Sequence, residues 1–471
     1  MAAALPPPED DSATPRVPAG SASPDGPVEA AAPGGRVEAV PPGGRVRATA
    51  PESPSAHPRW PHATLDTRGH RPVPFRQFVL KVHSRCNLAC DYCYIYEGAD
   101  SSWHTRPPSA GEETVRAAAA RIGEHVAVHR LRRIRIELHG GEPLLTGPGP
   151  VLAYARAVRA AVPASCRITA TVQTNGTLLT ERTLDALAAA GLRVGLSLDG
   201  GLAAHNDRRR DHARRPAWPA AHRAARLLAA RPGTYAGILC TIDLDTDPRE
   251  AYDSLLGLHP PGIDFLLPHG NWAAPPPGLA APGRPGRHRP RPTPYGDWLA
   301  ALFDTWWHTA RTPTRIRLFH EIAALLLGAP STAEAVGLSP MAAVVVDTDG
   351  AIEQVDSLKS AYPGAPATGL DVFRHPFDDA LRHPGIAARQ LGEGALAPDC
   401  RGCPVHRVCG GGNYVHRYAP GSGFLHPSVY CADLERLIRH VAHRLSRTAK
   451  PPATHREAPH TRTDSLPLTE I

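Results

Sequence analysis

The sequence predicts an α/β protein: an open or partial barrel of six β–α units, followed by a smaller cysteine-containing domain. Two observations predict this fold class. Short β-rich runs alternate with amphipathic segments through the middle of the chain, and such alternation implies a parallel sheet with right-handed crossovers. The composition changes after Gly328, where a Pro-, Gly- and Cys-containing region begins. Six units are too few for an eight-stranded barrel, so a partial one is expected.

The strands are expected where short runs are rich in β-branched and other apolar residues. These runs are residues 78–82, 133–138, 167–172, 193–198, 235–242 and 263–267. Between and after them, apolar residues recur at helical spacing. The resulting helices are expected at residues 111–131, 153–162, 181–190, 220–230, 249–258 and 295–309, with a last helix at 432–445. In such folds chemistry gathers where strands end, so the loops after the strands should carry the site.

Four parts follow along the chain. Residues 1–70 are rich in Pro, Ala and Gly with little hydrophobic periodicity, so we expect a disordered tail that cannot bury enough apolar surface to fold. Residues 71–328 should form the barrel and residues 329–447 the smaller domain. Residues 448–471 resemble the first segment and are expected to be a second disordered tail.

The charge balance is modest for 471 residues, with 52 Lys and Arg against 45 Asp and Glu. The basic runs at 208–210 and 214–215 contain no aromatic residues, so a solvated face is the simpler interpretation and no nucleic-acid partner is expected. No stretch approaches the about 20 apolar residues of a membrane-spanning helix, so no membrane contact is expected. The first residues lack the pattern of a secretory signal, which predicts a cytoplasmic protein.

Nine cysteines in such a protein argue against a disulfide framework, because the cytosol keeps thiols reduced. Seven of them fall in two tight groups, the pattern expected of metal or cluster ligation. The first group, Cys86, Cys90 and Cys93, directly follows the first strand. A four-iron cluster takes four thiolates, so three leave one iron open for a substrate. The alternative is a zinc knuckle completed by His83 or a distant residue.

The spacing Cys-x3-Cys-x2-Cys with Tyr92 before the last cysteine resembles the radical S-adenosylmethionine (SAM) superfamily. That resemblance implies a partial (β/α)6 radical SAM barrel and a [4Fe–4S] cluster whose open iron binds the amino and carboxylate groups of SAM. Reductive cleavage of SAM then gives methionine and a 5′-deoxyadenosyl radical.

Further segments after consecutive strands agree with this resemblance, which implies that they contact SAM. A glycine-rich edge with Glu142 would hold the SAM ammonium, and later segments would meet the ribose, the carboxylate and the adenine. The implied cofactor-binding residues are Tyr92, Gly140, Gly141, Glu142, Gln173, Asn175, Ser197, Asp199 and Leu239. Which arginine of residues 208–210 meets the SAM carboxylate stays open.

Four cysteines form the second group, with soft ligands that suit zinc or an iron–sulfur cluster. They are Cys400, Cys403, Cys409 and Cys431. Beside a radical SAM core this pattern resembles the SPASM domain, which carries auxiliary clusters in peptide and protein maturases. The cysteines expected at Val355 and Asn413 are missing, so the resemblance implies one auxiliary [4Fe–4S] cluster bound by all four thiolates. Cys166 and Cys240 are left over and are expected to be buried.

Residues 74–82, 356–359 and 409–418 together resemble the FxsB-type radical SAM/SPASM maturases. This similarity covers residues 72–447. It implies action on a small ribosomally synthesised precursor peptide, joining an aromatic ring carbon to a neighbouring Cβ to make a cyclophane. An external one-electron donor of the flavodoxin or ferredoxin type would supply the electron. Asp356 stands where related SPASM enzymes place an acidic base, which makes it the candidate general base; the alternative is a surface or turn carboxylate.

Two other functions remain open. One keeps the fold but oxidises a protein Ser or Cys, as sulfatase-maturing relatives do, or forms another peptide crosslink; it expects two auxiliary clusters, and the missing cysteines count against it. The other is a zinc-stapled binding protein without catalysis, which iron and sulfide content would exclude.

Overall fold

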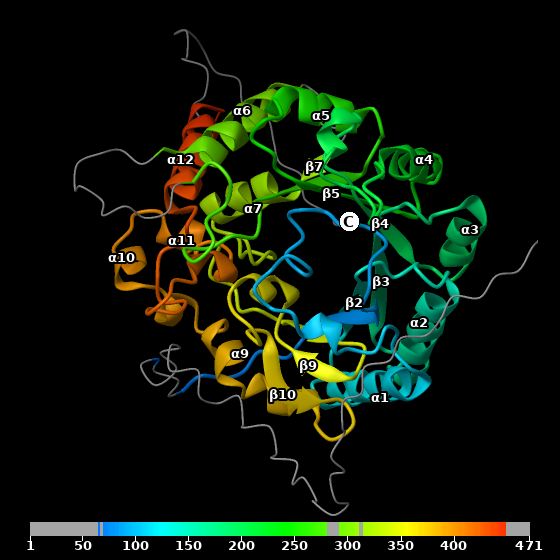
Figure 1. The fold of residues 1–471 in the computed structure, drawn as a ribbon. Helices are drawn as coiled ribbons and strands as arrows, with labels where there is room; N and C mark the ends of the chain where they lie inside the picture. The colour runs from blue at the N-terminus through cyan, green and yellow to red at the C-terminus, as the bar shows by residue number, and fades with distance from the viewer. Residues whose placement is uncertain (1–64, 66–68, 280–291, 310–313, 449–471) are drawn as a thin grey trace, which may run out of the picture. The chain divides into compact units, whose positions relative to one another are not determined.

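The structure is a computed structural model that describes residues 65, 69–279, 292–309 and 314–448 (Figure 1). All of them belong to one compact unit, Ser53–Ile471. The disordered tails predicted at 1–70 and 448–471 lie almost wholly outside the described residues.

The described residues form one ten-stranded sheet, in the order β10-β9-β8-β1-β2-β3-β4-β5-β6-β7. All six predicted strands form, pair in parallel and follow one another in sequence order. They are β1 (Gln77–His83), β2 (Arg133–Gly140), β3 (Arg167–Thr174), β4 (Arg193–Ser197), β5 (Tyr235–Thr241) and β6 (Gly262–Leu266).

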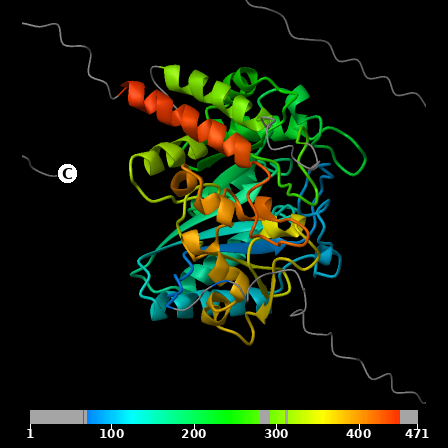
Figure 2. The same ribbon diagram turned by 90° about the vertical axis from the view of Figure 1, so that its left-hand side faces the viewer.

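The predicted helices also form, each within a few residues of its expected bounds, and they lie on the outer side of the strands in Figure 1. They are α1 (Glu112–Val128), α2 (Gly149–Ala161), α3 (Glu181–Ala189), α4 (Trp218–Ala229), α5 (Pro248–Leu256), α6 (Pro294–His308) and the last helix, α12 (Cys431–Thr448). α12 packs along α6 (Figures 1 and 2).

The two faces of β2 explain how the barrel is built. Ile134, Ile136 and Leu138 are buried in the hydrophobic core. Side chains alternate across a strand, so Glu137 and His139 point the other way, and both line an inner cavity. The barrel is therefore apolar toward its helices and polar inside.

The region after Gly328 does not form a sheet of its own, which the sequence did not predict. β8 (Ala343–Val346) pairs in parallel with β1, and β9 (Ala351–Glu353) and β10 (Ala367–Asp371) add antiparallel strands beyond it. The other unpredicted elements are β7 (Arg315–Ile316), α7 (Arg317–Leu326), α8 (Phe377–Leu381), α9 (Pro384–Ala388), α10 (Pro398–Arg401) and α11 (His406–Cys409). The domain boundary at 328/329 remains a prediction.

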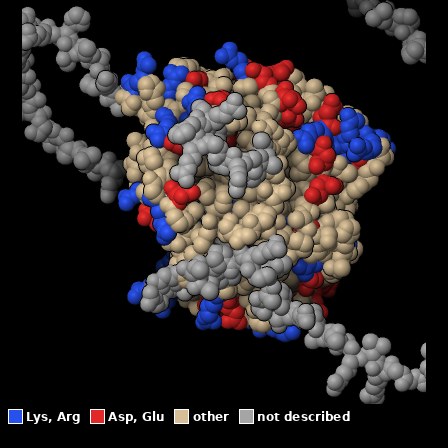
Figure 3. All heavy atoms as spheres, turned by 60° about the vertical axis from the view of Figure 1, so that its left-hand side comes forward, with Lys and Arg blue, Asp and Glu red and all other residues tan. Residues whose placement is uncertain are grey.

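The surface seen in Figure 3 has a centre with few charged side chains, and Lys, Arg, Asp and Glu are mixed around its edge. None of the helices in the described residues is both long and apolar enough to cross a membrane.

Candidate active site

The first cysteine group lies in the loop that leaves β1, at the carboxyl ends of the strands. Cys86, Cys90 and Cys93 all line one cavity of about 210 Å³, which we call the cysteine-loop cavity. Backbone bonds hold the loop: the Ala89 amide donates to the Arg210 carbonyl at 2.7 Å. Burial raises the pKa of Cys86 to about 12 and that of Cys90 to about 11. Thiols that stay protonated at neutral pH are poor nucleophiles, which argues against thiol catalysis by these residues.

The same cavity brings together eight of the nine residues predicted to contact SAM. They are Tyr92, Gly140, Gly141, Gln173, Asn175, Ser197, Asp199 and Leu239. They come from the ends of β2 to β5 and from the cysteine loop itself, up to 147 positions apart in the chain (Tyr92 to Leu239). Their contacts with SAM stay a prediction, but the fold places them around one space.

Gly141 shows why the turn after β2 is glycine-rich. A Cβ on this residue would lie 1.8 Å from the Tyr96 hydroxyl and 2.4 Å from the Arg85 carbonyl oxygen. The Glu142 amide also donates to that carbonyl at 3.0 Å. The strand end therefore presses against the cysteine loop more closely than any side chain permits.

Glu142 is the ninth residue predicted to contact SAM, and its side chain is held differently from the other eight. Its side chain is fully buried and does not line the cavity. The carboxylate instead accepts hydrogen bonds from the Thr174 hydroxyl at 2.7 Å and from the amides of Leu144 and Asn175 at 3.0 and 2.8 Å. Burial raises its pKa, which the hydrogen bonds oppose. Glu142 ties the end of β2 to that of β3, and its contact with the SAM ammonium stays a prediction.

Arg209 is the arginine of the run 208–210 that the fold buries. It is 6% exposed, lines the cysteine-loop cavity and donates to the Tyr92 hydroxyl at 2.8 Å. Its guanidinium lies 3.6 Å from Asp199, which Tyr92 also hydrogen-bonds. Arg208, in contrast, pairs with Asp91 at an exposed position. The fold thus turns one cation of the run inward.

A second cavity of about 360 Å³ adjoins the first, and we call it the Asp356 cavity after the candidate base that lines it. The two cavities share part of their lining: Tyr94, His139, Leu266, Leu267 and His269. A group bound in one therefore lies beside a group bound in the other.

Asp356 is a buried carboxylate and not a surface one, since it is 7% exposed. It begins a 3₁₀ turn, Asp356–Ser360, after β9. Lys81 of β1 lies 2.6 Å from its carboxylate. Burial opposes ionisation, but Lys81, Lys359 and His139 outweigh it and lower the pKa of Asp356. The carboxylate of Asp356 is therefore ionised at neutral pH.

Three histidines share the Asp356 cavity: His139, His269 and His416. Burial lowers the pKa of each, that of His269 to about 4. Within the described residues, both ring nitrogens of His416 lack a hydrogen-bond partner, so they can bond a peptide amide. Neither Lys81 nor these histidines stood out in the sequence.

The second cysteine group also converges. Cys400, Cys403, Cys409 and Cys431 line one small cavity of about 60 Å³, from α10, α11 and the start of α12. In the described part of the chain, no three cysteine sulfurs lie within 4.8 Å of one another. Four thiolates around one space suit either zinc or an iron–sulfur cluster, and the auxiliary cluster stays a prediction. Cys166 and Cys240 are buried in the core, as predicted.

A second auxiliary cluster would need cysteines at positions 355 and 413, and the residues found there have other structural roles. Val355 packs in an apolar cluster with Tyr414, Val415 and Phe424. The Asn413 side chain accepts a hydrogen bond from the Val415 amide at 3.2 Å and begins a 3₁₀ turn.

Comparisons with known proteins agree with this geometry. The radical SAM superfamily model matches residues 80–251. The serine-type anaerobic sulfatase-maturating enzyme of Klebsiella aerogenes is 33% identical over 162 residues, 33% of this chain, and the chain spans only 37% of that relative's length. The cysteine-type enzyme of Clostridium perfringens is 22% identical over 80% of this chain and 98% of its own.

One solved structure, native anSMEcpe with bound AdoMet and Cp18Cys peptide, has a TM-score of 0.63 at 21% identity and covers 80% of this chain and 99% of that one. The match confirms the fold, an α/β radical SAM partial barrel with a C-terminal auxiliary region. The matched residues 80–251 enclose the cysteine loop, so this part of the chain is similar to the radical SAM superfamily, and over most of its length the chain is similar to an anaerobic sulfatase-maturating enzyme.

Proposed function

We propose that this enzyme oxidises a side-chain Cβ–H of a peptide bound in the Asp356 cavity. The observation that carries the proposal is the shared wall between that cavity and the cysteine-loop cavity. A radical formed at SAM in the cysteine-loop cavity can reach a peptide side chain in the Asp356 cavity, where the ionised carboxylate of Asp356 lies.

The cofactors fit the residues present. Cys86, Cys90 and Cys93 would hold the radical SAM [4Fe–4S] cluster, and the other four clustered cysteines one auxiliary [4Fe–4S] cluster. When bound and reduced, the first cluster supplies the electron that cleaves SAM to a 5′-deoxyadenosyl radical. Arg209 would face the SAM carboxylate, and Tyr92 and Asp199 hold its guanidinium in place.

The protein's part in the reaction is to orient the peptide and remove a proton. The peptide would lose one hydrogen atom, one proton and one electron: Asp356 would take the proton, and the bound SAM and auxiliary cluster would supply the acceptors of the hydrogen atom and the electron. The net change is a loss of two hydrogens. Lys81 keeps Asp356 ionised before transfer, and the neutral imidazoles of His269 and His416 would hold the peptide.

Two products fit this scheme. The relatives that match include sulfatase-maturating enzymes, which favours oxidation of a Ser or Cys side chain to an aldehyde. The apolar packing of Val355 and the Asn413 cap leave one cysteine cluster in the auxiliary region. This favours the second candidate, a cyclophane crosslink in a small ribosomal precursor peptide. In both, the same cavity and base act.

Mass spectrometry of peptides treated anaerobically with the reconstituted enzyme, SAM and a flavodoxin or ferredoxin donor tests the proposal. The substrates are a small peptide encoded beside the gene and a serine-containing sulfatase peptide. We expect a loss of two hydrogens from one of them. A product that reacts with a hydrazide carries the aldehyde, and an unreactive product that resists fragmentation within a ring carries the crosslink. Deoxyadenosine formed with no change in either peptide would contradict the proposal.

Arg209→Ala is expected to weaken SAM binding at least about tenfold, because a hydrogen bond to a charged group contributes about 1.5–3 kcal/mol. The measurement is SAM affinity by equilibrium dialysis on the reconstituted protein. Arg208→Ala is the matched control, since the neighbouring residue Arg208 is exposed and pairs with Asp91. Equal losses in both variants would show that Arg209 has no special role.

A further inference from the structure

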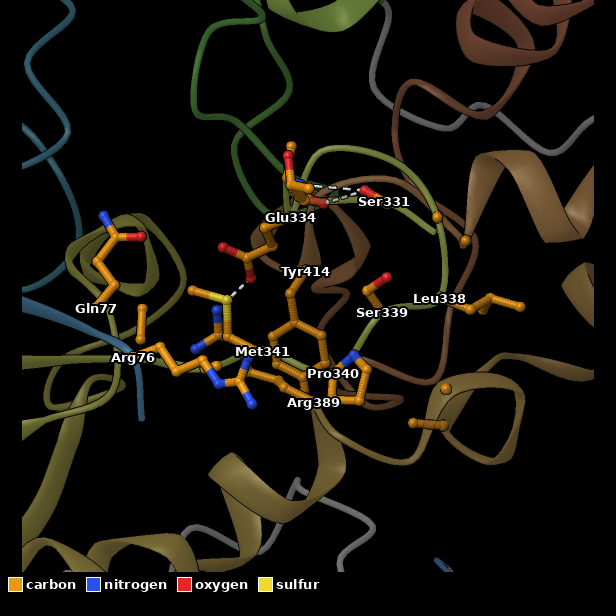
Figure 4. Close-up of a pocket in the computed structure, with 18 of the residues that line it drawn as sticks. Arg76, Gln77, Ser331, Glu334, Leu338, Ser339, Pro340, Met341, Arg389 and Tyr414 are labelled. Atoms are coloured by element: carbon orange, nitrogen blue, oxygen red, sulfur yellow. Dashed lines mark hydrogen bonds and ion pairs between the residues drawn. The ribbon is translucent and has the colours of Figure 1, made fainter. Parts of the chain in front are cut away.

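A third cavity, of about 490 Å³, lies at the amino-terminal ends of β1, β2 and β8, on the side of the barrel away from the cysteine loop. We call it the Arg389 cavity. It shares Gln77, Glu334 and Met341, among others, with the Asp356 cavity. Figure 4 shows these side chains around it. The three cavities therefore follow one another along the inside of the barrel.

The lining of the Arg389 cavity is basic. Four arginines and one carboxylate, that of Glu334, line it. The arginines are Arg76, Arg135, Arg389 and Arg417. The guanidinium of Arg135 forms an ion pair with the Glu137 carboxylate at 2.8 Å. The guanidinium of Arg389 forms one with Glu334 (Figure 4). Arg417 donates only to neutral carbonyls, those of residues 410–412. Two positive charges are left without a carboxylate.

Arg76 is one of these charges and lies exposed at the cavity's rim. No described carboxylate forms an ion pair with it. Its backbone amide donates to the Ala342 carbonyl at 2.8 Å, so β1 and β8 fix where the side chain begins. The rim therefore offers an available guanidinium.

Arg389 lies deeper in the cavity than Arg76. Its side chain is 3% exposed, and its guanidinium lies over the Tyr414 ring at 5.4 Å from the centroid. Its Nε has no hydrogen-bond partner among the described residues. Its Nη2 already pairs with Glu334. Leaving the buried Nε–H unpaired costs about 1–3 kcal/mol, so this donor would gain from an acceptor bound in the cavity.

We propose that the Arg389 cavity binds a carboxylate of the peptide substrate while the side chain to be oxidised lies in the Asp356 cavity. The inference rests on the proposed function for its substrate and names that substrate's class: a peptide with an acidic residue, or its own C-terminal carboxylate, near the oxidised position. The adjoining cavities let one extended peptide occupy both.

Binding of four octapeptides of Gly and Ser, each labelled with an uncharged fluorophore that has no carboxylate, tests this by fluorescence anisotropy, in the reconstituted protein without reductant. One carries two glutamates and a C-terminal amide, one carries two glutamines and a free C-terminal carboxylate, one carries two glutamines and an amide, and one carries two lysines and an amide. We expect the carboxylate peptides to bind at least about tenfold more tightly than the uncharged one, which corresponds to about 1.4 kcal/mol. The stronger of the first two identifies the carboxylate's source.

Arg76→Glu should abolish that preference, because it reverses a charge at an exposed position where folding is undisturbed. Arg389→Lys should reduce it while keeping the buried cation. Arg182→Glu, an equally exposed change on α3 outside all these cavities, should leave it intact. Equal affinity for the four peptides, or a preference unchanged in Arg76→Glu, would overturn the proposal. Because binding needs no radical, its failure is separate from failure of the oxidation.

Discussion

Cys86, Cys90 and Cys93 changed together to alanine should abolish SAM cleavage and halve the bound iron, from about eight to about four per chain, the content of one four-iron cluster. The three thiols line the cavity that also holds the residues predicted to contact SAM. The remaining four clustered cysteines line a separate cavity and are unaffected. The measurements are deoxyadenosine by chromatography, and iron and sulfide by chemical analysis after anaerobic reconstitution.

Cys166→Ala is the matched control, because Cys166 is a buried core cysteine that lines neither cavity. It should keep all the iron and full deoxyadenosine formation. Two results would refute the radical assignment: deoxyadenosine from the triple variant, or zinc in place of iron at the first site of the parent protein.

The fold was largely predictable because the β–α units are regular. Apolar runs and helical spacing alternate from residue 78 to residue 309, and each pattern became the element it indicates. The strands after Gly328 were not predicted from the sequence because β8 to β10 are only three to five residues long. Short apolar runs do not distinguish strands from buried helix segments, and the pairing of β8 with β1 joins positions over 260 residues apart in the chain.

The site was predictable where its residues stand in local motifs. In the cysteine loop and in the segments after β2 to β5, the residues that form each motif lie within a few positions of one another in the sequence. Lys81, Arg209 and His416 were missed because their role depends on which way the fold turns each side chain. Lys81 interrupts the apolar run of β1, and that interruption was the available signal: a lysine inside a buried strand needs a carboxylate partner. The partner, Asp356, lies 275 positions away.

Asp356→Asn should leave SAM cleavage intact and reduce the modified peptide about 100-fold or more, since a positioned general base contributes typically 10²–10⁴-fold. The amide keeps the shape of the carboxylate but cannot accept the proton. Deoxyadenosine and the loss of two hydrogens in the peptide, measured in the same reaction, separate the two steps.

The loss of the charge opposite Lys81 could by itself disturb the barrel, because breaking a buried ion pair is strongly destabilising. Asp347→Asn controls for this. Asp347 is also buried and lies 3.7 Å from the Lys81 ammonium, but it does not line the Asp356 cavity. If Asp356 is the base, Asp347→Asn keeps product formation at a comparable melting temperature. Equal product loss in both variants would assign the effect to Lys81 and the packing around it, and an undiminished yield in Asp356→Asn would remove this carboxylate from the mechanism.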